Sequence, residues 1–196
     1  RARVAVPWTQ LAGASHTLAV AKTGPGRLYY RVGIQYAPAK LDLPPLDAGF
    51  VVRRSYRAVD RPSDVTRTPD GNYKVRLGAV VVVTLEVLST SHRYAVALVD
   101  PLPAGFEIEN ARLGRGVKLE WAQPDDMWAV DFQNMRDDRV EAFGSLPPNT
   151  AKKIVYSVRA VTSGKFSIPP VEAEAMYDPT LWARAAGAML VVGGPW

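Results

Sequence analysis

The sequence predicts an all-β protein whose strands form an antiparallel β-sandwich. Short runs of β-branched and aromatic residues recur along the chain, and turn-forming residues separate them. Sixteen prolines and fifteen glycines are spread over the 196 residues, which favours many turns over long helices. Apolar residues at helical spacing are hard to find, although 47% of the residues are hydrophobic. Regularly spaced short strands with enough apolar residues for a core are typical of a sandwich.

The first segment, from Val4 to Tyr36, is predicted to form a unit of its own with the character of a β-hairpin. A short strand at Ser15–Val20 leads to the turn sequence Thr23–Gly26, and a long strand at Arg27–Tyr36 follows it. The next stretch, Ala37–Pro45, is extended and proline-rich. It is interpreted as a linker, so the domain boundary is expected there.

The rest of the chain is predicted to be organised around a central hairpin. Its two apolar strands are Ala79–Leu88 and the stretch Tyr94–Phe106, joined by the polar link Ser89–Arg93. Asp100-Pro101 and the turn at Pro103–Gly105 are expected to end the second strand, because proline has no amide proton for a ladder.

Further strands follow from the same alternation, and a polar loop is expected at Asp60–Asn72. That loop lacks the regular acid spacing and the final glutamate of a calcium-binding loop. The other strands are predicted at these positions: Phe50–Ala58, Trp128–Phe132, Arg139–Phe143, Ala151–Val161, Val171–Met176 and Ala185–Val192.

Composition argues against several partners and cofactors. The net charge is +5, but the 24 basic residues are scattered among 19 acidic ones, so a nucleic-acid surface is not expected. With no cysteine there is no disulfide, thiolate metal site or cysteine nucleophile. No apolar run approaches the ~20 residues that span a bilayer, and no signal peptide is recognisable. Since the chain opens at Arg1 without a methionine, we expect it to be part of a longer protein.

Catalytic and metal-binding constellations are weak, so the sequence predicts neither an enzyme nor a cofactor. The histidines, His16 and His92, stand far apart without a matching ligand set. Neighbouring carboxylates such as Asp125-Asp126 point to opposite faces of a strand. A hydrolase built on these acid pairs is one alternative. The other pair of neighbouring carboxylates is Asp137-Asp138. For this pair a structural ion-pair turn is favoured, formed by Arg136, Asp137, Asp138 and Arg139. Gly114-Arg115-Gly116 lacks the other parts of a phosphate loop.

Another alternative is a free-standing binding module of the adhesin or carbohydrate-recognition type. Trp121 and Trp128 flank a Pro-Asp-Asp loop and could form a sugar platform. Core or loop-anchor roles are favoured for both tryptophans, since large aromatic rings dominate core energetics.

Five stretches, in order along the chain, together resemble the C-terminal end of bacterial α2-macroglobulins. They are RLYYRVGIQY at Arg27–Tyr36, LPPLDAGF at Leu43–Phe50, ALVDPLPAG at Ala97–Gly105, DFQNMRDDRVEAF at Asp131–Phe143 and EAMYDP at Glu174–Pro179. The resemblance implies an immunoglobulin-like, macroglobulin-like sandwich, the domain MG10, over residues 39–196. Residues 1–38 would supply closing strands of a CUB-like domain, or an N-terminal hairpin of the same sandwich.

The resemblance also implies a function without chemistry of its own. Family members are broad-range protease traps, and their terminal sandwich packs against a helical thioester-type domain. Met176 and Tyr177 match the position of a lock that shields the thioester from water, and Asp178 and Pro179 would make the presenting loop rigid. The family's thioester cysteine lies outside this sequence, and in members without it the two lock residues would only pack an interdomain surface. On the sequence alone, both could equally pack on their own core.

The same resemblance supplies the expected partners and location. The partners would be the thioester-type domain and other macroglobulin-like domains of the parent chain, with target proteases met through the parent. The parent is expected in the periplasm, where a lipid anchor to the inner membrane and a cell-wall synthase as a partner are further expectations. No nucleic acid, membrane insertion, metal or cofactor is expected for this domain.

Overall fold

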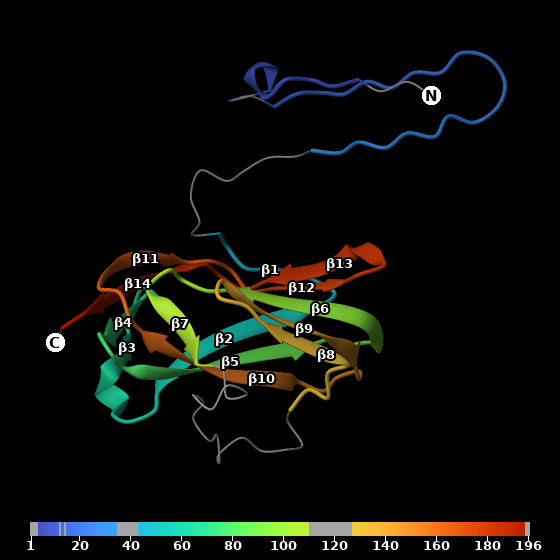
Figure 1. Ribbon diagram of the computed structural model, residues 1–196. Coiled ribbons are helices and arrows are strands. Elements are labelled where there is room, and N and C mark those ends of the chain that lie inside the picture. The colour runs from blue at the N-terminus through green and yellow to red at the C-terminus, as the bar shows by residue number, and fades with distance from the viewer. Residues whose placement is uncertain (1–3, 12, 14, 35–42, 110–126, 195–196) are drawn as a thin grey trace. The chain divides into compact units, whose positions relative to one another are not determined.

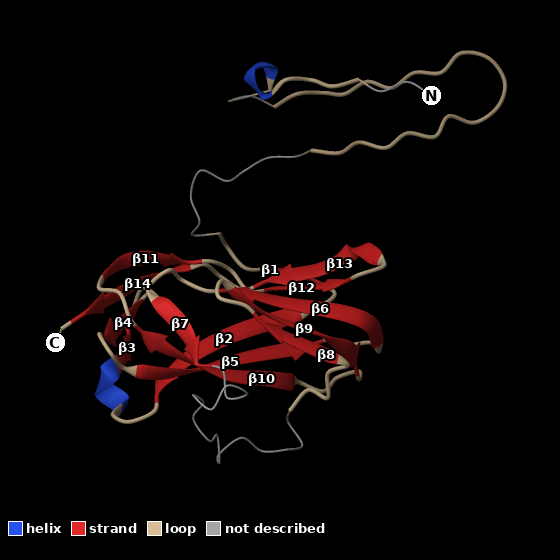
Figure 2. Ribbon diagram, viewed as in Figure 1, coloured by secondary structure: helices blue, strands red, loops and turns tan. Residues whose placement is uncertain are grey.

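The structure is a computed structural model that describes residues 4–11, 13, 15–34, 43–109 and 127–194 (Figure 1). The chain divides into two compact units, Arg1–Ala37 and Pro38–Trp196. The larger unit is built from β-strands, and this confirms the predicted all-β class (Figure 2). Within the described ranges, no helix has the length and apolar character needed to cross a membrane.

Three sheets make up the larger unit. The six-stranded sheet has the order β1-β13-β12-β6-β9-β8, and two four-stranded sheets have the orders β2-β5-β10-β7 (the β5 sheet) and β11-β14-β4-β3 (the β14 sheet). Among the described strands every pairing is antiparallel except β14 with β4. The strands are β1 (Leu46–Ala48), β2 (Val51–Ala58), β3 (Val65–Arg67), β4 (Tyr73–Arg76), β5 (Val80–Leu88), β6 (Arg93–Pro101), β7 (Phe106–Glu109), β8 (Phe132–Met135), β9 (Arg139–Leu146), β10 (Lys152–Ala160), β11 (Gly164–Ile168), β12 (Glu172–Ala175), β13 (Asp178–Arg184) and β14 (Ala188–Gly193).

The predicted central hairpin is wrong, because β5 and β6 belong to different sheets. β5 pairs with β2 and β10, whereas β6 pairs with β9 and β12. The link between them crosses from one sheet to the other. The buried Ser89 hydroxyl donates to the carbonyl of Gly49 at 3.0 Å, and the Ser89 carbonyl accepts from the Asn149 N–H at 2.8 Å. The two-residue turns most favoured in hairpins place Asn or Gly at positive φ, and Ser89–Arg93 contains neither.

Alternation along the strands turns one side of each sheet into the core. On β5 the side chains of Val81, Val83, Leu85 and Val87 stand at every second position, and each is at most 1% exposed. The eight residues of β9 alternate in the same way between half-buried and buried positions. Burial of a Val or Leu side chain contributes about 1.5–3 kcal/mol. Such rows are therefore the main force that holds the sheets together.

An aromatic cluster joins the β5 sheet to the β14 sheet. Tyr56 of β2 lies edge-on to Tyr73 of β4, with ring centroids 4.9 Å apart, and to Phe106 of β7 at 5.8 Å. Edge-to-face pairs contribute about 0.5–1.5 kcal/mol beyond the area that they bury. Burial raises the pKa of the Tyr56 phenol well above its usual range, so the ring stays neutral.

A polar bridge of Arg54, Asp100 and Tyr156 lies buried between the β5 sheet and the six-stranded sheet. Nη1 of Arg54 donates to Oδ1 of Asp100, and the Tyr156 hydroxyl donates to Oδ2 at 2.5 Å. Nη2 of Arg54 also donates to the carbonyl of Pro169 at 2.5 Å. Burial raises the pKa of Asp100, while the charge of Arg54 and the two hydrogen bonds act in the opposite direction. β6 ends at Pro101, as the proline predicts, but the sequence does not indicate this role of Asp100.

The smaller unit differs from its prediction. Among its described residues, 4–11, 13 and 15–34, none lies in a strand, and the regular element is the 3-10 turn η1 (Trp8–Gln10). The strand predicted at Ser15–Val20 is therefore not formed, and neither is the described part, 27–34, of the strand predicted at Arg27–Tyr36. The turn at Gly24 and Pro25 is present, and Nζ of Lys22 donates to both carbonyls, at 2.6 and 2.7 Å. Strand preference reflects packing against a neighbour, whereas the apolar side chains of this segment are exposed.

Strand positions in the larger unit agree with the prediction where alternation is long and differ where strands are short. The strand predicted at Trp128–Phe132 is not formed; the strand in this region, β8, begins only at Phe132. The expected loop Asp60–Asn72 contains the 3-10 turn η2 (Pro62–Asp64) and β3, and β13 was not predicted. Pairing with a neighbour defines each of these strands: β8 pairs with β9, β3 with β4, and β13 with β12. The predicted strands that are confirmed correspond to β2, β9, β10, β12 and β14.

Candidate functional site

Met176 and Tyr177 form the two-residue turn of the β12–β13 hairpin. The register pairs Ala175 with Asp178, so only these two residues stand between the strands. The Met176 side chain is 49% exposed and that of Tyr177 is 87% exposed. The interpretation that both pack on the domain's own core is therefore wrong. This hairpin tip presents a thioether and a phenol ring to its surroundings.

Hydrogen bonds brace the hairpin tip from both sides. The N–H of Met176 donates to the carbonyl of Ala95, in the neighbouring strand β6, at 2.9 Å. Oδ1 of Asp178 accepts from the hydroxyl of Thr180 at 2.6 Å and from its N–H at 3.1 Å. These bonds lower the pKa of Asp178, so the carboxylate is charged at neutral pH. Asp178 and Pro179 were expected in a loop, but they are the first residues of β13.

The turn between β8 and β9 carries the ion-pair cluster considered in the sequence. Arg139 lies 2.8 Å from Asp138 and 2.6 Å from Glu141, and Arg136 lies 3.5 Å from Glu141. The network is therefore centred on Glu141, whose pKa is lowered by hydrogen bonds from Arg139 and Asn134. Sequence reasoning missed Glu141, although it stands two residues after Arg139 and hence on the same face of β9. Asp137, in the same turn, is exposed.

The acid pair Asp137-Asp138 and the histidine His92 lie in different connections between strands. Asp137 and Asp138 lie in the turn with its arginines, and the ring of His92 lies 4.2 Å from that of Tyr94. In the part of the chain that the structure describes, no group of three or more His, Cys, Asp or Glu side chains could hold a metal ion. Three candidates of the sequence analysis lie outside the described residues: Asp125-Asp126, Gly114-Arg115-Gly116 and Trp121.

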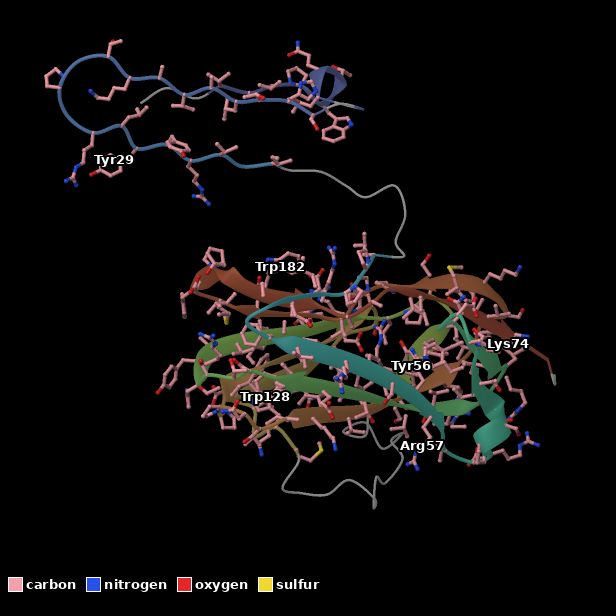
Figure 3. All side chains as sticks on the ribbon, turned by 180° about the vertical axis from the view of Figure 1, so that it is seen from behind. Tyr29, Tyr56, Arg57, Lys74, Trp128 and Trp182 are labelled. Atoms are coloured by element: carbon pink, nitrogen blue, oxygen red, sulfur yellow. The ribbon has the colours of Figure 1, made fainter. Side chains whose placement is uncertain are left out.

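Trp128 is a core residue and not a sugar platform. Trp128 is labelled in Figure 3. Its side chain is 5% exposed, and its indole N–H donates to the carbonyl of Ser145 at 2.8 Å. A ring that stacks on a sugar must present a face to solvent, and Trp128 does not. The expectation of a core role is confirmed for this residue.

Fold and site together define a macroglobulin-like β-sandwich with an exposed, hydrogen-bonded hairpin tip. Residues 49–180 match the family described as "Bacterial Alpha-2-macroglobulin MG10 domain". The chain belongs to this family. The resemblance found in the sequence is thereby confirmed, and the chain is one domain region of a multidomain parent.

Two alpha-2-macroglobulins are among the individual relatives of this chain. The chain is 29% identical over 194 residues to an alpha-2-macroglobulin homolog of Nostoc, a match that covers 97% of this chain and 10% of that protein. It is 32% identical over 172 residues to "Circularly permutated Ras protein 2" of Dictyostelium discoideum, which covers 87% of this chain and 4% of that protein. The structure of trypsin-activated alpha-2-macroglobulin from Escherichia coli matches with a TM-score of 0.64 and 28% identity, covering 78% of this chain and 11% of that one. The chain thus spans about a tenth or less of the length of these relatives.

Proposed function

We propose that this domain is a non-catalytic contact module of an α2-macroglobulin-type protease trap. In this proposal the hairpin tip, Met176 and Tyr177, docks on the thioester-type domain of the same parent chain and keeps water from it. The observation that carries the proposal is an exposed Met-Tyr pair, 49% and 87% exposed, held at a braced turn. The family membership supports it, as does the trypsin-activated form of the Escherichia coli relative.

The chemistry of the two side chains suits this role. A thioether and an aromatic ring exclude water while adding little polar surface that needs a partner. Burial of such a side chain contributes about 1.5–3 kcal/mol, which is available only when a neighbour covers the tip. The two-residue turn and the bond to Ala95 fix the backbone beforehand, so little conformational entropy is lost on docking.

The remaining assignments belong to the same proposal. Residues 1–38 would complete a CUB-like domain, and the exposed apolar side chains among the described residues 4–11 and 15–34 support burial against further chain. The parent would work in the periplasm, with target proteases as its partners. No reaction is assigned to this domain.

The double variant Met176→Ala/Tyr177→Ala in the full-length parent tests the tip. With the apolar cover removed, methylamine is expected to react with the thioester about tenfold faster or more, because one lost burial of 1.5–3 kcal/mol is at least a factor of ten. Free thiol released and protease retained after digestion are the two readouts. In a parent without a thioester, the expected result is a loss of protease retention alone.

A matched control removes one methionine and one aromatic ring elsewhere. Met189→Ala/Phe132→Ala changes side chains that are 38% and 59% exposed, on β14 and β8. This variant is expected to react and trap like the unchanged protein. Equal behaviour of the two double variants would refute the assignment of the tip.

A further inference from the structure

Tyr94 is a large apolar side chain that the sandwich leaves in solvent. It is 74% exposed, and among the described residues 43–109 and 127–194 only Tyr177, at 87%, is a more exposed large apolar residue. Most aromatic rings in these two ranges are in or against the core, as Tyr56 and Trp128 are. Exposed apolar side chains that gather in one place mark interaction sites more often than single ones do. The position of Tyr94 relative to Tyr177 therefore matters.

Tyr94 lies near the start of β6, and Tyr177 lies in the turn that follows the neighbouring strand β12. β12 and β6 pair antiparallel up to Ala175 opposite Val96. The bond from the Met176 N–H to the Ala95 carbonyl, 2.9 Å, continues that register by one step. Tyr177 follows Met176 and Tyr94 precedes Ala95, so each tyrosine is the chain neighbour of a residue joined by this hydrogen bond.

A bulge in β6 marks this position. The register between β6 and β9 shifts between Arg93 and Val96, and Ala95 has a φ of 50°. A left-handed backbone is uncommon for a residue with a Cβ, and it is retained where the surrounding structure requires it. Bulges re-aim side chains at the edges of sheets. The ring of His92 lies next to Tyr94, with the two ring centroids 4.2 Å apart.

We propose that Tyr94, backed by His92, extends the hairpin tip into one continuous contact surface, formed by His92, Tyr94, Met176 and Tyr177. Its occupant is the same neighbouring domain of the parent chain that the tip is proposed to meet. The inference rests on the proposed function of the tip. The parent supplies such neighbours, because the chain matches only a tenth of its Nostoc relative. Tyrosine and methionine are enriched in the buried centres of interfaces.

Site-specific photo-crosslinking in the full-length parent tests the surface. A benzophenone amino acid is placed at position 94, at position 177 or at position 53, one position at a time, and crosslinked peptides are mapped by mass spectrometry. Position 53 is the matched control, because the Arg53 side chain is 76% exposed on β2 in the other sheet. We expect positions 94 and 177 to crosslink to peptides of the same neighbouring domain, and position 53 to give none of these products.

The outcomes separate this inference from the proposed function. Crosslinks from 177 to a neighbouring domain without any from 94, or crosslinks from 94 to a different domain, would overturn the continuous surface and leave the tip's role intact. If neither position exceeds the position 53 control, both proposals fail. Crosslinks from both positions that disappear after protease digestion would further support a contact of the native state.

Discussion

Arg54→Ala is expected to lower the free energy of unfolding of this chain by about 3–5 kcal/mol, which is the cost of leaving a buried charge without its partner. The Arg54 side chain is 5% exposed and that of Asp100 is 1% exposed. Without the guanidinium, the Asp100 carboxylate keeps its bond from Tyr156 but loses the neutralising charge. Urea denaturation followed by tryptophan fluorescence and far-UV circular dichroism measures the change.

The neighbouring arginine provides the control for Arg54. Arg53 points to the opposite face of β2, and its Nη1 lies 3.9 Å from Glu86 in an exposed pair. Such pairs contribute about 0–1 kcal/mol, so Arg53→Ala is expected to change little. Similar losses from both substitutions would contradict the role assigned to the buried bridge.

The pH dependence of the Arg54 variant has a definite sign. Burial raises the pKa of Asp100 in the folded state. Without the positive charge of Arg54, less opposes the rise in the pKa of Asp100. At a pH between the two pKa values, Asp100 is then protonated in the folded state and ionised in the unfolded state. Stability is lost as pH rises above the ordinary aspartate range, and it returns as pH falls toward that range. The deficit of Arg54→Ala should therefore be smaller near pH 4 than at pH 7.

Trp128→Ala is expected to cost about 3–5 kcal/mol, as large-to-small changes of buried aromatic residues do. The side chain is 5% exposed, and it lies against the chain at Gly144. Its indole N–H satisfies the carbonyl of Ser145. Equilibrium denaturation, followed by far-UV circular dichroism, checks the loss.

Trp128→Phe separates packing from hydrogen bonding. It keeps an aromatic ring in the core but leaves the Ser145 carbonyl without its donor, so about 1–3 kcal/mol is expected to be lost. A Trp128→Ala variant as stable as the parent chain, with altered glycan binding, would contradict the core assignment and restore a sugar-platform role.

Alternation predicts the long strands of this fold and fails where pairing or connection decides the structure. β9 and β10 are predictable because one face of each is buried at every second residue. The hairpin of β5 and β6 is not, since a short polar link can cross between sheets as well as turn within one. β13 escapes prediction because Asp178-Pro179 has turn chemistry, and its strand exists through pairing with β12 and β1.

The site was predictable only in part, and by resemblance more than by chemistry. Met176 and Tyr177 carry no catalytic signature, and the sequence alone leaves open whether they pack inward. The structure adds their exposure and their bond to Ala95. Tyr94 could not be singled out from the sequence. The bulge beside it needs a left-handed backbone at Ala95, and alanine, unlike glycine or asparagine, gives no sign of such a conformation. Arg54 and Asp100 are 46 positions apart, so their pairing follows from topology alone.

Oxidative footprinting of Met176 and Tyr177 tests the central claim, which is that the hairpin tip of this domain contacts a neighbouring domain of the parent chain. The modification rate in the native full-length parent is compared with that in the 196-residue chain, with Met189, 38% exposed, as the internal reference. We expect both tip residues to be strongly protected relative to Met189 in the native parent and to lose that protection after protease digestion. Equal rates in the parent and in the isolated chain, before and after digestion, would contradict the account.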